Sequence, residues 1–315
     1  MDRMKTFVLP HTDLTAPVVV AGMMRIRDLS EDAIRKLVDA ELEQGIRFFD
    51  HADVYGGAPH ACEQRFAQAL QLTPSQRESM VLQTKCGIVR TARGVYYDFS
   101  ADHIVESVEG SLRALRTDYL DILLLHRPDT LVEPDEVAYA FDQLEASGKV
   151  RYFGVSNHTP GQIELLKTAV AQPLVVDQMQ LSITHSPLIA QGLAANMAGQ
   201  QQSVSRDLGL LDYARAQGVT LQAWSPFQRG DAYGVFLGNP QNAILNGVLF
   251  RLAKEYDVTP MGVATAWITR HPAHMQVVLG TTRPDRVREV ARGADLNLTR
   301  AEWYELFETA GHIVP

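Results

Sequence analysis

Residues 45–57 read GIRFFDHADVYGG, a short apolar strand that leads directly into a loop of reactive side chains. The apolar run ends at Phe49, and Asp50, a second carboxylate and Tyr55 follow before two glycines close the loop. Neighbouring side chains of a strand point to opposite faces, so Asp50 and His51 cannot both enter one pocket. A carboxylate and a phenol in the loop directly after a strand are typical of a reaction site rather than of a hydrophobic core.

The composition of the 315 residues favours a globular protein with a full hydrophobic core, because 46% of them are hydrophobic. The net charge of -8 and the absence of a basic cluster argue against nucleic acid as a partner. No apolar run approaches the ~18 residues of a membrane span. Only Cys62 and Cys86 are present, and no apolar signal region follows the first residues. We therefore expect a reducing, cytoplasmic setting without disulfides.

Short apolar runs alternate with helical patterns, and eight of these runs are predicted strands. They are 17–21, 46–49, 80–84, 119–125, 150–155, 174–176, 220–223 and 276–279. Helix starts are legible between them, at Ser30 and in the capping boxes at 159–162 and 299–302. Strict alternation of strand and helix indicates a parallel sheet.

Eight units without an internal linker favour closure of this sheet into a (β/α)8 TIM barrel, a single domain over residues 1–315. The alternative is an open doubly wound sheet, but no Gly-x-Gly-x-x-Gly follows the first strand. Residues 7–13, ahead of that strand, are interpreted as half of a hairpin that plugs the bottom of the barrel.

Three long connections follow predicted strands, at 86–99, 181–204 and 226–241. Long loops in a compact domain are usually functional or disordered, and loops after strands lie at the face where barrel enzymes bind substrate. The aromatic walls expected there come from Tyr96, Tyr97, Phe227 and Tyr233.

Unusual polar residues occur at the C-terminal end of every predicted strand except the first. In chain order they are Asp50 with Tyr55, Lys85, His126, Ser156 with Asn157, Gln178, Trp224 with Ser225, and Gly280 with Thr281 and Thr282. Closure of the barrel would gather all of them in one mouth, the face on which such barrels carry out chemistry.

Four of these side chains form a plausible catalytic group around one substrate oxygen. They are Asp50, Tyr55, Lys85 and His126. An ammonium beside Tyr55 would stabilise the phenolate and lower the pKa of this phenol from about 10. Lys85 can supply the ammonium, and Asp50 would hold it charged and oriented. His126 can donate a hydrogen bond to a polarised oxygen. Together they suit a carbonyl that accepts hydride.

The joint pattern resembles the aldo-keto reductase family along essentially the whole chain. The matching motifs are Gly45-x-Arg47-x-x-Asp50-x-Ala52-x-x-Tyr55-Gly56, Lys85 at a strand end, Leu-Leu-Leu-His126, Gly154-Val155-Ser156-Asn157 and Val-Val-Asp-Gln178. Asp50-His51-Ala52-Asp53 and Lys85-Cys86-Gly87 are similar to the family's bacterial YdhF-like branch. The resemblance implies a (β/α)8 barrel that binds NADP(H) without a Rossmann motif. It implies Tyr55 as general acid/base, with Lys85 adjusting its pKa. Asp50 would be the partner of Lys85, and His126 would orient the carbonyl.

The resemblance also implies how the cofactor is held. Ser156, Asn157 and Gln178 would bind the nicotinamide carboxamide, whose acceptor and donors amide and hydroxyl groups can match. Trp224 stands where the family usually stacks an aromatic ring on the nicotinamide. The remaining expected contacts are Gly22, Ser225, Gly280, Thr281 and Thr282.

Residues 280–286 match the family's phosphate segment, in which Arg286 would meet the 2′-phosphate. Two departures weaken the expected preference for NADPH. Gly280 stands where many members carry Lys, and Val290 where many carry an adenine-binding Asn. NAD(H) use therefore stays open.

Two other functions are compatible with a barrel. A Schiff-base lyase would use Lys85 as nucleophile, although Asp50 would keep the amine protonated. A nucleotide-sensing subunit would bind NADPH with little turnover. No metal is expected, because Pro272 interrupts His271-Pro272-Ala273-His274 and acidic or Cys companions are lacking. The substrate is predicted only as a small carbonyl compound, and the sequence does not predict the oligomeric state.

Overall fold

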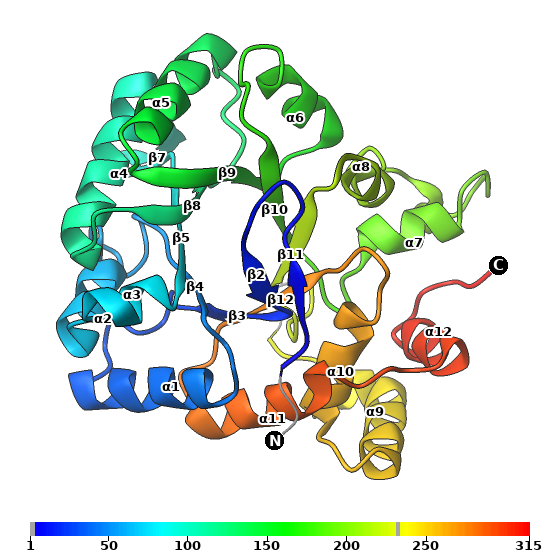
Figure 1. Ribbon diagram of the computed structural model, residues 1–315. Helices are drawn as coiled ribbons and strands as arrows, with labels where there is room; N and C mark the ends of the chain where they lie inside the picture. Colours follow the sequence, from blue (N-terminus) through cyan, green and yellow to red (C-terminus); the bar gives the residue numbers. More distant parts are fainter. Residues whose placement is uncertain (1–3, 231–233) are drawn as a thin grey trace.

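The computed structural model describes residues 4–230 and 234–315, and a closed barrel of eight parallel strands lies at its centre. The strands follow the order β10-β11-β12-β3-β4-β5-β8-β9 around the ring, and helices cover its outside (Figure 1). They are β3 (Val19–Gly22), β4 (Phe48–Asp50), β5 (Val81–Cys86), β8 (Leu120–Leu125), β9 (Val150–Ser156), β10 (Leu174–Gln180), β11 (Thr220–Trp224) and β12 (Gln276–Leu279). Each predicted strand overlaps one of them, so the predicted (β/α)8 barrel is confirmed.

The outer helices begin where the sequence has capping residues. Ser30 accepts a hydrogen bond from the backbone of Ala33, and both predicted capping boxes form, at Thr159 and Thr299. Apolar residues at helical spacing, such as Ile104, Val108 and Leu112, face the barrel and are buried.

Among the described residues, no helix combines the length and apolarity that crossing a bilayer requires. The helices are α1 (Glu31–Glu43), α2 (Ala61–Leu70), α3 (Pro74–Glu78), α4 (Ala101–Leu115), α5 (Pro134–Ala146), α6 (Pro160–Leu166), α7 (Pro187–Leu193), α8 (Leu210–Gln217), α9 (Ala243–Glu255), α10 (Pro260–Thr269), α11 (Pro284–Ala294) and α12 (Arg300–Thr309), with short 3-10 turns η1 (Gln201–Ser203) and η2 (Pro240–Asn242).

A hairpin closes the N-terminal end of the barrel, as predicted. Its strands β1 (Thr6–Val8) and β2 (Thr15–Pro17) pair antiparallel, and the hairpin crosses the centre of the ring in Figure 1. Leu9 and Leu14 from this hairpin pack in one cluster with inward-facing strand residues such as Phe48. The lower half of the barrel is therefore filled by an apolar core.

Above this core, the barrel interior becomes a layer of hydrogen-bonded glutamines. The Gln276 amide donates to the Pro17 carbonyl at 2.7 Å, and Gln222 donates to Gln276 at 3.0 Å. Gln83 and Gln178 both donate to the Gln222 oxygen, at 2.8 and 2.9 Å. Sequence reasoning missed this layer. The signal was present, because each glutamine lies within or at the start of a strand that consists largely of buried residues.

The long connections after strands contain secondary structure of their own. Residues 86–99 form a second hairpin, in which β6 (Ile88–Thr91) pairs antiparallel with β7 (Gly94–Tyr97). The sequence predicted a long connection here but not this hairpin. The connection 181–204 contains α7 and η1.

Gly154 on β9 faces the barrel interior at a point where no side chain fits. A Cβ atom there would lie 2.7 Å from both the Leu124 Cδ2 atom and the Val176 carbonyl oxygen. Such separations are far below van der Waals contact, and one of these atoms belongs to the backbone of the neighbouring strand. The close approach of β8, β9 and β10 therefore requires glycine.

We predict that Gly154→Ala lowers the free energy of unfolding by about 1–3 kcal/mol, because overpacking of the interior forces the strands apart. Gly247→Ala is the matched control, since a Cβ atom at this exposed α9 position meets nothing within 4 Å. It should be neutral or stabilising by up to ~1 kcal/mol. Urea denaturation followed by circular dichroism measures both. Equal stability of Gly154→Ala and wild type would contradict the packing argument.

Candidate active site

Lys85 is the centre of a buried polar cluster at the C-terminal end of the barrel. Its ammonium donates to both carboxylate oxygens of Asp50 at 2.7 Å and to the His51 carbonyl at 2.8 Å. It also lies 3.1 Å from the Tyr55 hydroxyl. The side chain is fully buried. Adjacent strands β4 and β5 produce this contact, because Asp50 is opposite Gln83 in register and Lys85 is two residues further along the same face.

The loop after β4 holds Tyr55 over this ammonium through backbone hydrogen bonds. His51 N–H donates to the Gln83 carbonyl at 2.8 Å, and Asp53 N–H donates to the Lys85 carbonyl at 3.0 Å. The Tyr55 carbonyl accepts from Cys62 N–H, at the start of α2. The phenol is thereby fixed between the end of β5 and the second outer helix.

Burial and neighbouring charges shift the pKa values of Lys85 and Tyr55 in opposite directions. Burial disfavours the ammonium of Lys85, but Asp50 and Tyr55 outweigh it and raise the lysine pKa above its ordinary value. Burial raises the pKa of Tyr55 above its ordinary value as well, although the Lys85 charge pulls it down. The expected net lowering of the Tyr55 pKa is therefore wrong, because burial of the phenol, with the nearby charge of Asp50, outweighs the effect of the Lys85 ammonium.

His126 follows β8 and presents its ring edge-on to Tyr55, with centroids 5.7 Å apart and planes at 82°. Burial, with nearby cations, holds the pKa of His126 well below its ordinary value, so the imidazole is neutral. Its Nδ1 atom is buried and has no hydrogen-bond partner among the described residues. Because an unpaired buried N–H is costlier than an unpaired acceptor, we assign the proton to Nε2.

His51 points away from the site, as strand alternation predicts. Its ring packs edge-on against Phe66, with centroids 4.7 Å apart, and burial lowers its pKa to about 4. Asp53 is also buried, and this burial together with the Glu63 charge raises its pKa to about 7. Both residues support the loop from behind rather than facing the site.

A cavity of about 690 Å³ opens above the four side chains, and Asp50, Tyr55 and His126 line it. Lys85 lies beneath this lining. The predicted cofactor residues in the lining are Gly22, Ser156, Asn157, Gln178, Trp224, Ser225, Gly280, Thr281 and Arg286. Thr282 lies outside it.

Two of the expected aromatic walls, Tyr97 and Phe227, also line the cavity. The expectation for Tyr96 is wrong: it neighbours Tyr97 on a strand, points to the opposite face and is exposed. Tyr233 lies outside the described residues.

Hydrogen bonds prepare one side of the cavity for an amide group. The Trp224 indole N–H donates to the Asn157 oxygen at 3.1 Å, and the Asn157 amide donates to the Ser156 hydroxyl at 2.8 Å. Gln178 donates its amide N–H groups inward, to Asp50 at 3.1 Å and to Gln222 at 2.9 Å. Its oxygen accepts no hydrogen bond from the described residues, so it fits the donors of a carboxamide.

The segment before α11 suits phosphate groups. Arg283 forms an ion pair with Asp285, whereas Arg286 faces the cavity and has no ion pair within the described chain. A Cβ atom at Gly280 would meet nothing within 4 Å. Because glycine has no side chain, this part of the cavity wall is open space. Val290 is fully buried, so this position serves the core rather than a ligand.

Three further arginines line the cavity, namely Arg25, Arg90 and Arg127. Sequence reasoning identified no charged anchor for a substrate. Arg127 could have been found from its place directly after His126. Arg90 could not, because it lies in the β6–β7 hairpin, which the sequence did not predict.

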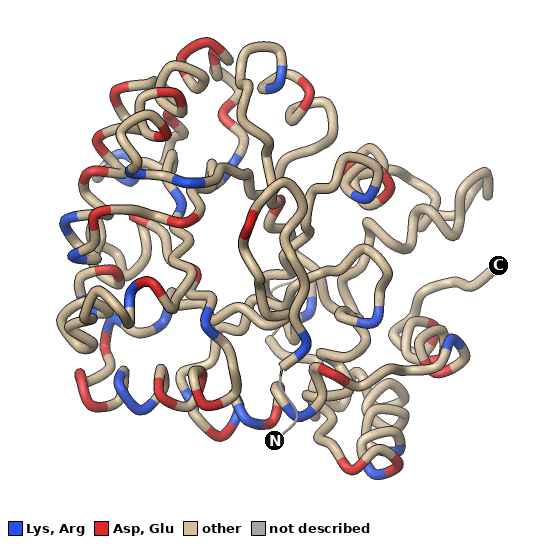
Figure 2. Tube along the Cα trace, viewed as in Figure 1, with Lys and Arg blue, Asp and Glu red and all other residues tan. Residues whose placement is uncertain are grey.

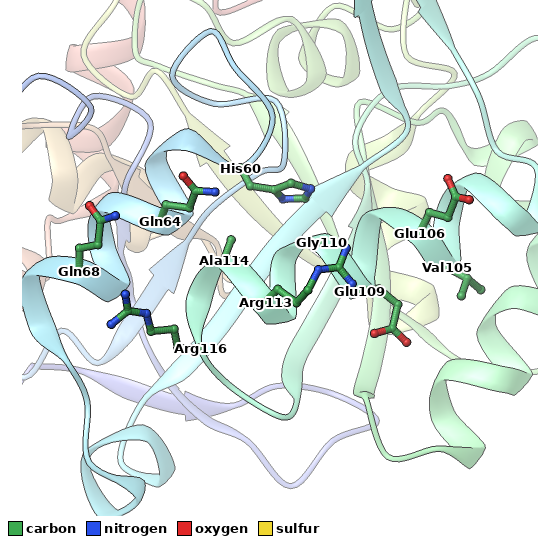
Figure 3. A pocket seen from close by; sticks show the side chains of 10 residues that line it. All are labelled: His60, Gln64, Gln68, Val105, Glu106, Glu109, Gly110, Arg113, Ala114 and Arg116. Carbon is green, nitrogen blue, oxygen red and sulfur yellow. The ribbon is translucent and has the colours of Figure 1, made fainter.

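A second cavity of about 860 Å³ lies outside the barrel, between α2 and α4. Figure 3 shows its side chains, with Gln64 and Gln68 on α2 and Glu109 and Arg113 on α4. None of the four clustered catalytic candidates lines it. We therefore place the candidate site at the barrel mouth.

Comparison with known proteins agrees with this geometry. Residues 18–309 match the model of the Aldo/keto reductase family. A 6-dehydroglucose reductase of Agrobacterium fabrum (strain C58) is 36% identical over 301 residues, 93% of this chain and 93% of that protein. Oxidoreductase YdhF of Escherichia coli (strain K12) is 36% identical over 304 residues, 94% of each chain. A thermostable aldo-keto reductase, crystallised with the inhibitor epalrestat, has a TM-score of 0.76 at 25% identity, covering 97% of this chain and 100% of that one. The chain belongs to the aldo/keto reductase family.

Proposed function

We propose that the protein is an NADP(H)-dependent reductase that converts an aldehyde or ketone to an alcohol, with Tyr55 as the general acid. The observation that carries this proposal is the Tyr55 hydroxyl, 3.1 Å from an ammonium that is itself held by both oxygens of Asp50. The enzyme would act as a single domain in the cytoplasm, and the free, buried Cys62 and Cys86 fit a reducing compartment.

Each residue of the cluster has a distinct part in this reaction. A bound reduced nicotinamide supplies the hydride for the carbonyl carbon. Tyr55 gives its proton to the carbonyl oxygen, and Lys85 stabilises the phenolate that is left. Asp50 keeps Lys85 charged and in place. His126, neutral and protonated on Nε2, donates a hydrogen bond to the same oxygen.

The hydrogen bonds of Lys85 argue against a Schiff-base lyase. A nucleophilic amine must lose its proton, whereas Asp50 and Tyr55 raise the pKa of Lys85 despite its burial. The ammonium also contacts four acceptor atoms. A lyase would need each of these contacts to be broken.

We predict that Tyr55→Phe lowers kcat for carbonyl reduction by about 10²–10⁴-fold, because the variant has no proton donor. NADPH binding, followed by tryptophan fluorescence, should change little. The matched control is Tyr139→Phe, which removes a hydroxyl from an exposed tyrosine of α5 and should leave kcat unchanged. Reduction that survives in Tyr55→Phe would refute the assignment. Tight NADPH binding by the wild type without turnover of any carbonyl compound would favour the nucleotide-sensing alternative.

The pH profile gives an independent test of the acid. Reduction needs the protonated phenol, and the pKa of Tyr55 lies above its ordinary value. We predict a single-turnover rate that is flat from about pH 6 to 9 and falls only above about pH 10. His126 adds no step near pH 6.5, because its pKa lies well below that value. A fall centred near neutral pH would mean that another group donates the proton.

Substitution of Arg286 tests the proposed preference for NADPH over NADH. Loss of a charged hydrogen bond is worth about 1.5–3 kcal/mol, so Arg286→Met should raise the Kd for NADPH roughly ten- to a hundredfold and leave the Kd for NADH nearly unchanged. Arg283→Met is the control, because Arg283 is paired with Asp285 and lies outside the cavity lining. Equal weakening of NADPH and NADH by Arg286→Met would contradict a contact with the 2′-phosphate.

A further inference from the structure

The candidate active-site cavity is positively charged, although the chain as a whole is acidic. Its described lining contains one carboxylate, Asp50, and four arginines: Arg25, Arg90, Arg127 and Arg286. Asp50 is already bonded to Lys85 through both oxygens. The chain carries a formal charge of -8, and acidic and basic residues are mixed around the outer helices (Figure 2). The excess of arginine is therefore local to the cavity.

Two of these arginines lie beside the proposed carbonyl site rather than beside the phosphate segment. Arg127 directly follows His126 after β8, and Arg90 lies just beyond the end of β5, the neighbouring strand. In the ring of eight strands, β8 is four places from β12, the strand that precedes Arg286. Strands four places apart face each other across the mouth. The backbones of Arg90 and Arg127 are thus across the mouth from the phosphate segment, and the Arg127 guanidinium extends toward Trp224 at the end of β11.

Arg90 reaches the cavity because the β6–β7 hairpin turns one face toward it. Ile88 is paired with Tyr97, and Arg90 is paired with Val95. Side chains of directly opposed residues share a face, and all four of these residues line the cavity. Arg90 is the charged member of an otherwise apolar and aromatic wall.

Neither arginine is neutralised by a carboxylate of the described residues. Within residues 4–230 and 234–315, no carboxylate forms an ion pair with Arg90 or Arg127. The Arg127 guanidinium instead lies 5.6 Å from the centre of the Trp224 ring. Burial is the main cause of the low pKa of His126, and the charges of Lys85, Arg127 and Arg90 add to it in that order. Both guanidinium groups therefore act within electrostatic range of the imidazole.

We propose that the substrate is a carbonyl compound with an anionic group, which Arg90 and Arg127 bind while the carbonyl faces Tyr55 and His126. Guanidinium forks match carboxylate and phosphate oxygens, so either acid would be recognised. This inference rests on the proposed reductase function and adds the substrate class to it. A neutral carbonyl compound is the competing class.

Paired substrates that differ in charge test this inference. The pairs are 4-carboxybenzaldehyde with its methyl ester, succinic semialdehyde with butanal, and glyceraldehyde 3-phosphate with glyceraldehyde. In assays with NADPH, the wild type should favour the anionic member of the carboxylate pairs, of the phosphate pair, or of both. This preference should shrink as salt is added, because screening weakens exposed charges.

Arg90→Met should lower kcat/KM for the favoured anionic substrate on the order of tenfold, chiefly through KM, and change the neutral member by less than about twofold. Arg93→Met is the matched control, since Arg93 lies at the turn of the same hairpin and outside the cavity lining. It should leave both members unchanged. Circular dichroism and the Kd for NADPH verify that the fold and the cofactor site are intact in each variant.

Three outcomes separate this inference from the reductase function. A wild type that reduces neutral and anionic members equally well keeps the reductase function and overturns the anionic substrate. The same holds if Arg90→Met weakens both members alike. If no carbonyl compound is reduced, the reductase function itself fails, and the substrate class fails with it.

Discussion

The buried ion pair of Lys85 and Asp50 is the constraint on which the upper half of the barrel depends. Removing one partner of such a pair leaves an uncompensated buried charge and typically costs 3–5 kcal/mol. The pair is tolerable here because its remaining hydrogen-bonding capacity is used: Lys85 also donates to the His51 carbonyl, and Asp50 accepts from Gln83 at 2.6 Å. These hydrogen bonds offset the free energy of burying the Lys85 charge, and they also fix the ammonium beneath Tyr55.

The glutamine layer extends this constraint from the site to the bottom of the barrel. Hydrogen bonds lead from the Pro17 carbonyl through Gln276 and Gln222 to Gln83 and Asp50. Buried amides cost free energy unless they are paired, so each glutamine is held in the orientation its neighbour requires. A fully connected network of this kind rigidifies a core. The plugging hairpin, which contributes Pro17, is therefore linked to the position of a carboxylate at the opposite end.

Sequence alone predicted the strands and the four clustered side chains because both depend on simple rules. Apolar runs of strand length alternate with helices, and parallel strands bring their C-terminal ends to one mouth. The rest depended on quantities that the sequence does not carry. The face of Tyr96 and the direction of Arg90 follow from the register of a hairpin that was not predicted. The pKa of Tyr55 follows from its degree of burial, which outweighs a cation that was correctly placed beside it.

The balance of burial and charge also bears on the proposed reduction, in which Tyr55 is the general acid. Oxidation of an alcohol needs a base, hence a phenolate, and burial of Tyr55 disfavours that form. Reduction needs the protonated phenol, which is the form that burial stabilises. The raised pKa of Lys85 keeps its amine charged beside the Tyr55 hydroxyl, as the proposed proton transfer requires. In the proposed reduction, the phenolate would form only during proton transfer, with Lys85 already in place to stabilise it.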